Sequence, residues 1–213
     1  MAGSVRVQWR SHASARCSVR FDAESLCPER CGKRLSDGAA QRLQVRLVAA
    51  LQDGHRDVTL RDERDEDVPF LCGLYAEVRA QELAPVDWSE ARKRTFTDSQ
   101  FALQSEHYRR HYPGAEFLVI ERDGVPIGRV YLCAFVDTIR LMDIALVEAQ
   151  RGQGIGTVLV RELMQLARER GTTLTLHVEP HNPAQRLYAR LGFKFVEKRS
   201  VYDFLEWTPR ATS

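Results

Sequence analysis

The amino-acid sequence predicts a single α/β domain: a mixed central sheet of about six to seven strands with four flanking helices. Two observations support this prediction. Three strand-like segments follow one another within residues 116–147 and are separated by short turns, as in an antiparallel meander. Helical patterns precede this meander, and helical and strand patterns alternate after it, which is typical of the α/β class. With 213 residues, 44% of them hydrophobic, the chain can bury one core of ordinary size.

The strands are recognised as short apolar runs bounded by turn residues. Asp123 and Gly124 form a dipeptide that is typical of a tight hairpin turn, and Asp137 with Thr138 closes the next turn. Both turns connect strands without an intervening helix, so these strands pair antiparallel. The expected strands are residues 57–62, 116–122, 125–136, 139–147, 173–178, and two further strands within residues 193–207.

The helices are recognised by apolar residues at helical spacing and by their end signals. Leu159, Leu163 and Leu166 share one face of a helix that Gly171 ends. The expected helices of the domain are residues 66–83, residues 98–112, the segment from the glycine-rich turn to Gly171, and residues 182–192, with Asn182 as N-cap and Pro183 at the first position.

The first 55 residues show weaker patterning, so we expect an N-terminal extension that is partly helical or disordered. Leu43, Leu47 and Leu51 recur every four residues ahead of Gly54 and predict one helix there. We expect the domain itself to span residues 56–207, followed by a tail of residues 208–213.

Composition narrows the class of partner. The net charge is +2. No apolar run approaches the roughly 18 residues of a membrane helix, and the beginning of the sequence lacks the apolar region of a secretory signal. We therefore expect a cytoplasmic protein without a membrane partner. Residues 1–56 carry ten basic against five acidic residues, but these are scattered and not interleaved with aromatic residues, so we expect no nucleic-acid partner.

The five cysteines do not predict a metal site. Cys72 and Cys133 lie inside apolar patterns, where cysteine is usually a small buried hydrophobe. Cys17, Cys27 and Cys31 cluster near the start, but the paired C-x-x-C spacing of zinc sites is absent. We therefore interpret them as ordinary thiols.

A glycine-rich turn carries the main functional signal. Gly152, Gly154 and Gly156 lie between an apolar strand and a helix. The N-terminus of a helix has unpaired N–H groups and a partial positive charge, and glycine lets a ligand approach the backbone, so the turn is suited to an anion such as phosphate. Arg151 adds a cation beside it. On this motif alone, a plain connection without a ligand stays an alternative.

Two phosphate-binding motifs do not fit the turn. A P-loop requires Lys followed by Ser or Thr, which is absent here. A dinucleotide fingerprint requires a third glycine where Thr157 stands, and its strands are linked through helices rather than hairpins. Glu179 could imitate the ribose-binding acid, but too few residues follow it for the missing strand–helix units.

The remaining combination resembles the GCN5-related N-acetyltransferase (GNAT) superfamily. Its signature R/Q-x-x-G-x-G/A after the fourth strand is matched by residues 151–156, RGQGIG. A second family feature is Asn182, then Tyr188 six residues on, then the Gly192–Phe193 pair.

The resemblance extends to the order of the elements. That order is similar to the family from about residue 57 to residue 207, and the resemblance does not cover residues 1–55.

The resemblance implies acetyl-coenzyme A as co-substrate, no metal, and a primary amine as acceptor. In this family the diphosphate lies on the N–H groups of the turn, and the pantetheine arm pairs with the free edge of the fourth strand, where it splays from the fifth. The resemblance assigns coenzyme binding to Ile144, Ala145, Leu146, Arg151, Gly152, Gln153, Gly154, Ile155, Gly156, Thr157 and Asn182.

Tyr188 and Asp143 are the expected catalytic residues. By resemblance, Tyr188 supplies the proton to the leaving thiolate, because a phenol with a pKa of about 10 is protonated near neutral pH. The alternative for Tyr188 is an aromatic anchor of its short helix. The base that deprotonates the amine is less defined: Asp143, Glu179, His177 and a chain of water molecules are the candidates.

The acceptor is not readable from the sequence. Direct attack by the amine in a ternary complex is the expected mechanism, and a small amine, a peptide N-terminus or a lysine side chain would each fit. The alternative function is a non-catalytic acyl-coenzyme A-binding module. Dimers are common in the family, and no motif here decides for or against a homodimer.

Overall fold

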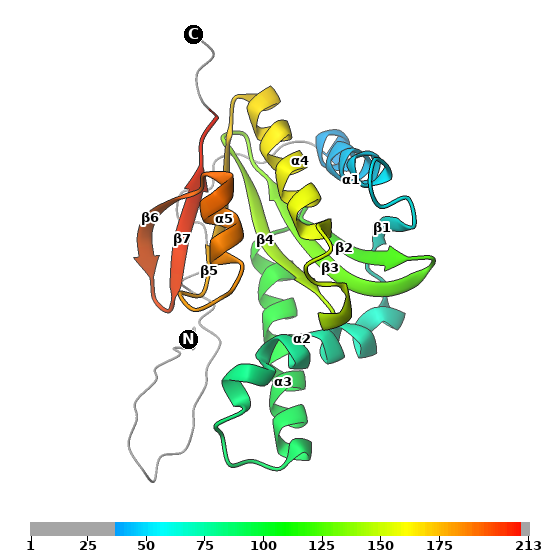
Figure 1. Ribbon diagram of the computed structural model, residues 1–213, viewed down its shortest axis with the longest axis vertical. Helices are drawn as coiled ribbons and strands as arrows, with labels where there is room; N and C mark the ends of the chain where they lie inside the picture. Colours follow the sequence, from blue (N-terminus) through cyan, green and yellow to red (C-terminus); the bar gives the residue numbers. More distant parts are fainter. Residues whose placement is uncertain (1–36, 210–213) are drawn as a thin grey trace.

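A computed structural model of the protein describes residues 37–209, which form a sheet with helices on both faces (Figure 1). The helices of this part of the chain are α1 (Asp37–Gln52), α2 (Val68–Leu83), α3 (Glu90–His111), α4 (Ile155–Arg170) and α5 (Gln185–Leu191), with short 3-10 turns at Asp65–Asp67 and Glu148–Gln150. The strands are β1 (Val58–Asp62), β2 (Glu116–Arg122), β3 (Val125–Ala134), β4 (Thr138–Leu146), β5 (Thr173–Val178), β6 (Lys194–Arg199) and β7 (Tyr202–Trp207).

The seven strands form one sheet in the order β1-β2-β3-β4-β5-β7-β6. β4 and β5 are parallel, and every other neighbouring pair is antiparallel. This arrangement confirms the predicted α/β class with a mixed sheet. The four helices predicted for the domain and the helix predicted ahead of it are the five α-helices found in residues 37–209.

The two faces of the sheet hold separate clusters of apolar side chains. Along β3, Val130 and Leu132 belong to the main core, to which α1, α4 and α5 also contribute. The alternate residues Tyr131 and Cys133 pack on the opposite face with side chains of α3. Helices α2 and α3 therefore lie on one side of the sheet, and α1, α4 and α5 on the other (Figure 1).

Helix α1 packs on the domain although we expected it within the N-terminal extension. Leu43, Leu47 and Leu51, which predicted this helix, are all fully buried in the main core. Burial of a leucine side chain contributes about 1.5–3 kcal/mol relative to exposure. The expected boundary at residue 55 therefore falls between two parts that pack together. Of the expected tail, Thr208 and Pro209 alone are described.

Helix α3 begins earlier than predicted. We expected a polar stretch up to about residue 98, but the helix begins at Glu90 after the N-cap Ser89, whose hydroxyl accepts a hydrogen bond from the Arg92 N–H at 3.3 Å. The first turns lack an apolar face and instead carry the ion pair of Glu90 with Lys93. A search for apolar periodicity therefore misses them, and the serine cap is the signal that marks the beginning.

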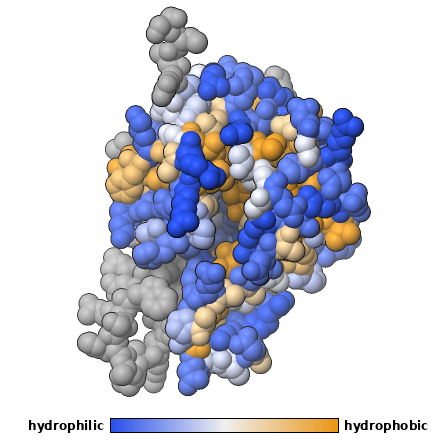
Figure 2. All heavy atoms as spheres, in the orientation of Figure 1, coloured by the Kyte–Doolittle hydropathy of each residue, from blue (hydrophilic) through white to orange (hydrophobic). Residues whose placement is uncertain are grey.

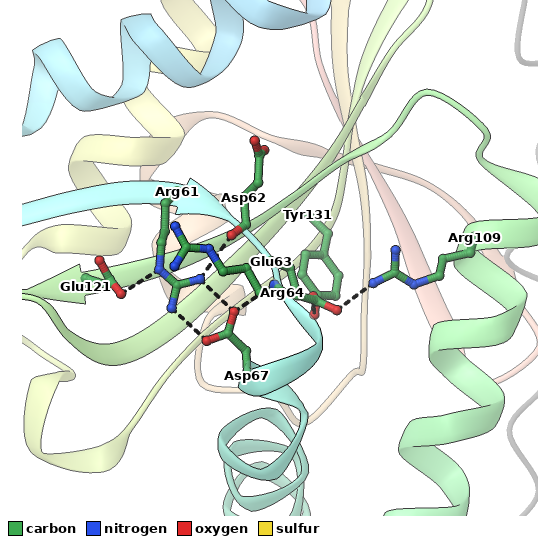
Figure 3. A network of polar contacts seen from close by, with 8 residues as sticks. All are labelled: Arg61, Asp62, Glu63, Arg64, Asp67, Arg109, Glu121 and Tyr131. Atoms are coloured by element: carbon green, nitrogen blue, oxygen red, sulfur yellow. Dashed lines mark hydrogen bonds and ion pairs between the residues drawn. The ribbon is translucent and has the colours of Figure 1, made fainter.

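A polar network joins β1 to the helices of the α2–α3 face (Figure 3). Arg61 donates through both terminal nitrogens to the Asp67 carboxylate, at 2.6 and 2.7 Å, just before α2 begins. The nearly buried Glu63 accepts hydrogen bonds from the Tyr131 hydroxyl at 2.5 Å and from Arg109 of α3 at 2.6 Å. The ends of α2 and α3 are thus held against β1 and β3 by charge-assisted hydrogen bonds.

Other predictions concern membranes and metals. Among residues 37–209, no helix is both long and apolar enough to cross a membrane. In the same part of the chain, no group of three or more His, Cys, Asp or Glu side chains is arranged to hold a metal ion. Cys133 is buried and Cys72 half-buried, and both carry reduced thiols. Cys17, Cys27 and Cys31 lie outside the described residues.

Candidate active site

The sheet opens between β4 and β5. The two strands pair from Thr138–Thr173 to Leu141–Leu176, and β4 continues to Leu146 without a partner on that side. A β-bulge at Met142 shifts the register with β3 at the point where the pairing with β5 ends. The unpaired segment, residues 142–146, includes Ile144, Ala145 and Leu146. The Met142 carbonyl accepts from the Tyr108 hydroxyl and the Leu146 carbonyl from Arg151. The other N–H and C=O groups along this edge are suited to pair with an extended ligand, as predicted from the family resemblance.

The glycine-rich turn leads directly into α4. Gly152 and Gly154 have φ angles of 74° and 94°, in the left-handed region that favours glycine. Gly154 is the N-cap, and no side chain caps the helix. The N–H groups at the start of α4, from Ile155 to Thr157, therefore lack intrahelical acceptors and are suited to an anion. The Ile155 side chain is fully buried, so this residue can contribute to such a site through its backbone.

Gly156 lies where α4 crosses the unpaired part of β4. A Cβ at this position would stand 3.9 Å from Cδ1 of Ile144. Ile144 and Leu146 pack with the main core on the α4 side of the sheet. By alternation, Asp143 and Ala145 point to the α2–α3 side. The sequence alone left this orientation undecided.

The polar residues of the turn are engaged within the protein. Arg151 donates through Nε to the Leu146 carbonyl at 2.8 Å and pairs with Glu77 of α2 at 2.7 Å, in an exposed position. The Gln153 side chain donates to the Ala149 carbonyl at 2.8 Å. The roles of Arg151 and Gln153 in coenzyme binding stay predictions. A phosphate group would compete with the Glu77 carboxylate for the Arg151 guanidinium.

Tyr188 lies on α5 and is 5% exposed. Its ring packs against Phe193, with 5.5 Å between ring centroids. Burial raises the pKa of the Tyr188 phenol well above its usual range, and the negative charge of Asp143 adds to this effect. The phenol is therefore protonated at neutral pH, as a proton donor must be. The burial and the contact with Phe193 show that the Tyr188 ring anchors its short helix, which is the alternative role given above, while its role as proton donor stays a prediction.

Asp143 is held by a buried arginine. Arg129 of β3, 3% exposed, donates through Nη2 to Asp143 Oδ2 at 2.8 Å and to Gln104 Oε1 at 3.0 Å. Its guanidinium also lies over the ring of Phe101. Burial lowers the pKa of the Arg129 guanidinium, but Asp143 together with the hydroxyls of Tyr131 and Tyr108 outweighs burial, and the pKa is raised. Asp143 is thereby fixed in orientation on the α2–α3 side of the opening.

A second group of charges spans the far side of the opening. Arg79 of α2 donates to Glu179, just after β5, at 2.5 Å, and to both carboxylate oxygens of Glu82 at 2.9 Å. Burial raises the pKa of the nearby Tyr202 hydroxyl to about 12, with Arg79 lowering it and Glu179 raising it. Burial also raises the pKa of Glu82. These contacts tie α2 to β5 and β7 across the sheet.

His177 is not suited to act as the base. Arg140 donates a hydrogen bond to its ring nitrogen. Burial first, and then the charges of Arg140 and Arg199, lower the pKa of His177 to about 2. The imidazole is therefore neutral and engaged at neutral pH, which leaves Asp143 and Glu179 as the carboxylate candidates.

Asn182 acts as a turn residue ahead of α5. Its Oδ1 accepts a hydrogen bond from the Ala184 N–H at 2.9 Å. Helix α5 begins at Gln185, so the predicted start at Pro183 is a turn rather than the first helical position. The side chain thus fixes the turn that leads into α5, on which Tyr188 lies, and its role in coenzyme binding stays a prediction.

Figure 2 shows apolar side chains in the hollow between α4 and α5, with hydrophilic residues around it.

The sequence reasoning missed three residues of the site. Arg129, Arg79 and Gln104 stand in stretches read as strand or helix, and nothing nearby in the sequence indicates their partners. The sequence offers one weak signal for Arg129: an arginine stands among the apolar residues of 125–134, and a buried charge requires a partner of opposite charge.

With this geometry described, a comparison with protein families decides the class. A model of the acetyltransferase (GNAT) family matches residues 79–193. The chain belongs to this family. It is an N-acetyltransferase that uses acetyl-coenzyme A. Membership confirms the predicted family and its acyltransferase activity. The role of the glycine-rich turn in coenzyme binding stays a prediction.

The chain is also similar to individual acetyltransferases. One relative is the Bacillus subtilis (strain 168) protein named putative ribosomal protein bS18-alanine N-acetyltransferase. The two sequences are 32% identical over 122 residues, and this aligned region covers 56% of this chain and 81% of the relative. The fold is similar to PaiA N-acetyltransferase from Thermoplasma acidophilum in complex with coenzyme A, with a TM-score of 0.55 and 20% identity over 71% of this chain and 99% of that one. A GCN5-related N-acetyltransferase from Rhodopseudomonas palustris has a TM-score of 0.52 and 21% identity, over 71% and 95% of the two chains.

Proposed function

We propose that this GNAT enzyme acetylates the α-amino group of a protein N-terminus by direct attack in a ternary complex. The opening between β4 and β5 supports the proposal, because its unpaired edge includes Asp143, and Tyr188 lies near enough for the charge of Asp143 to raise the pKa of its phenol. Acetyl-coenzyme A, when bound, supplies the thioester. The backbone of residues 142–146 aligns with its pantetheine arm, and the N–H groups of residues 152–157 bind its diphosphate.

The backbone and Tyr188 divide the work of acyl transfer. An N–H group near the β4 bulge donates to the thioester carbonyl oxygen and stabilises the negative charge that develops there. Tyr188 donates its proton to the leaving sulfur. The raised pKa of the phenol keeps it protonated until the thiolate forms, and the buried position excludes competing water.

Asp143 is the base in this proposal. It lies on the α2–α3 side of the opening, from which the amine enters, and Arg129 orients its carboxylate. Glu179 is engaged with Arg79 on the far side, where Glu82 shares the same guanidinium. The N-terminal ammonium group, with a pKa of about 7.7–8.0, must lose a proton before it attacks. Asp143→Asn should remove the acidic limb of the pH–rate profile, and Glu179→Gln should leave that limb in place.

The acceptor class follows from the relative and from the charge of the opening. The Bacillus subtilis relative is named for the alanine of a ribosomal protein. In this chain, the carboxylates of Asp143, Glu179 and Glu82 pair with the guanidinium groups of Arg79 and Arg129, which leaves a surplus of one negative charge among these five side chains. A single ammonium group fits this surplus better than a polycation does.

Product analysis tests the proposal directly. The enzyme is incubated with acetyl-coenzyme A and one of three acceptors: a peptide beginning with alanine, the same peptide with a blocked N-terminus and an internal lysine, and spermidine. Free thiol is measured over time, and mass spectrometry locates the acetyl group. We expect acetylation of the α-amine of the first peptide. Acetylation of lysine or spermidine at a higher rate would contradict the protein N-terminus as acceptor.

The non-catalytic alternative predicts another outcome of the same experiment. A binding module would show thermal stabilisation by acetyl-coenzyme A, about 2.7 kcal/mol at a hundredfold excess over Kd, without release of thiol to any acceptor. Membership in the acetyltransferase family already favours the enzyme over this alternative.

A further inference from the structure

The glycine-rich turn is tied to a distant part of the chain by Arg122, the last residue of β2. Its Nη1 donates to the side-chain oxygen of Gln153 at 2.8 Å and to that of Gln150. Its Nε forms an ion pair with Asp57, with 2.8 Å between Nε and Oδ2. One half-buried guanidinium thus joins both glutamines of the turn to the connection between α1 and β1.

The α1–β1 connection, residues 53–57, is itself firmly held. The His55 N–H donates to the Leu51 carbonyl at the end of α1, at 2.7 Å, and the Asp57 carbonyl accepts from the Asp123 N–H at 2.8 Å. The His55 imidazole lies beside the turn at Gly154. A Cβ at Gly154 would stand 3.6 Å from its Nε2, an ordinary contact distance.

Helix α1 anchors this connection to α4. Its three buried leucines pack in the same core as Leu159 and Leu163 of α4. Arg46 of α1 pairs with Glu162 at 2.7 Å and with Glu169 at 2.8 Å. Helix α1 therefore packs along the side of α4, and the connection that follows α1 contacts the turn at the N-terminus of α4. This helix lies outside residues 79–193, which the family model matches.

We propose that Arg122 is a positioning residue for coenzyme A and that α1 with the α1–β1 connection forms a supporting part of the coenzyme site. This inference rests on the proposed use of the turn as the diphosphate site. Ordering a residue of a flexible turn costs conformational entropy. Arg122 fixes Gln150 and Gln153 before the ligand binds, so less ordering remains to oppose binding.

Binding measurements on Arg122→Met test the inference, because methionine keeps most of the apolar stem and removes the guanidinium. The probes are acetyl-coenzyme A, adenosine 3′-phosphate 5′-diphosphate as the half with the diphosphate, and S-acetylpantetheine as the half without it. We expect about a tenfold loss of affinity for the first two, which corresponds to about 1.4 kcal/mol. The KM for S-acetylpantetheine, the KM for the amine and kcat should change by less than about twofold.

Arg94→Met is the matched control. It removes an exposed ion pair with Asp98 within α3, on the other face of the sheet, so affinity for all three probes should stay within about twofold of the native value. Asp57→Asn should give a smaller loss than Arg122→Met, confined to the same two probes, because it loosens the arginine without removing it.

Three outcomes separate the possibilities. Native affinity for the nucleotide half in Arg122→Met would overturn the inference. An equal loss for both halves of the donor, together with a lower Tm, would show general loosening of the fold and also overturn it. Absence of acetyl-coenzyme A binding by the native protein would instead overturn the proposed use of the turn, before any variant is compared.

Discussion

The two halves of the active site are built by different means. The half that we propose binds the donor, residues 142–146 and 151–157, offers backbone groups: an unpaired strand edge and a helix N-terminus without a side-chain cap. The acceptor half, formed by α2, α3 and the ends of β5 and β7, offers charged and phenolic side chains that are buried in pairs. Backbone groups recognise what every acyl-coenzyme A shares, whereas side chains can change without disturbing the sheet. The enzyme can thus keep one donor and specialise for its acceptor.

The largest effect is expected where the acceptor half depends on a buried charge. Arg129→Met should destabilise the protein by about 3–5 kcal/mol, because Asp143 then keeps a partly buried charge without its partner. At about 2–4 °C per kcal/mol, thermal unfolding should show a fall in Tm of about 6–20 °C.

A double variant and a surface control sharpen this test. Arg129→Met combined with Asp143→Leu should regain most of the stability, since the unpaired charge is then removed. Arg46→Met removes exposed pairs, with the Arg46 side chain 39% exposed, and should cost less than about 1 kcal/mol. Equal losses in Arg129→Met and Arg46→Met would refute the difference between the two environments.

Tyr188 of α5 lies outside both halves and is proposed to act on the leaving sulfur, so its removal should affect the rate rather than the affinity for either substrate. Tyr188→Phe should lower kcat by one to three decades, because the leaving sulfur loses its proton donor. Calorimetry should give an unchanged Kd for acetyl-coenzyme A. Tyr112→Phe removes a hydroxyl from another buried tyrosine and should leave kcat within about twofold. If Tyr188→Phe keeps the native kcat, Tyr188 is not the proton donor and contributes through packing alone.

The donor half should respond to backbone strain. Gly154→Ala places a side chain at a φ of 94°, which costs about 1–2 kcal/mol, and the turn must shift to relieve it. The Kd for acetyl-coenzyme A should rise by about tenfold, while the KM for the amine stays constant. Gly114→Ala has the same kind of strain at a φ of 85° with open space around it, and should leave the Kd unchanged. Equal Kd values for the two variants would speak against the turn as the diphosphate site.

The smallest effect is expected at a contact between the halves. Glu77 of α2 accepts hydrogen bonds from Arg151 at 2.7 Å and from the Glu148 N–H at 2.6 Å. Glu77→Gln removes an exposed ion pair worth less than about 1 kcal/mol and leaves Arg151 available for phosphate. Acetyl-coenzyme A should bind more tightly, by less than about fivefold in isothermal titration. Glu66→Gln, the same charge change on the surface, serves as control, and weaker binding by Glu77→Gln would contradict the competition.

The difference between backbone features and paired side chains also explains which parts of the site could be predicted from the sequence. The strands and the hairpin at Asp123 and Gly124 were predicted because apolar runs and turn residues are local signals. The glycine-rich turn and Tyr188 belong to short motifs and were predicted for the same reason. The beginning of α3 was missed because its first turns are held by charges and by the Ser89 cap rather than by an apolar face.

The acceptor half depends on contacts between distant residues. The pairing of Arg129 with Asp143 requires the register of β3 with β4, including the bulge at Met142, which no local pattern encodes. Arg79 and Glu179 are 100 residues apart. Such partners follow from the assembled sheet, so the sequence indicated Asp143 and Glu179 as candidates without deciding between them.

Burial of the Arg129–Asp143 pair has a consequence for the ionic environment. At physiological salt, mobile ions screen charges over about 8 Å, but they act through the solvent and barely reach a pair inside the protein. The field that orients Asp143 is therefore nearly independent of ionic strength. The exposed contacts of Arg151 at the turn are open to screening. Salt thus acts on how strongly the donor is held, while the electrostatic setting in which the amine reacts stays constant.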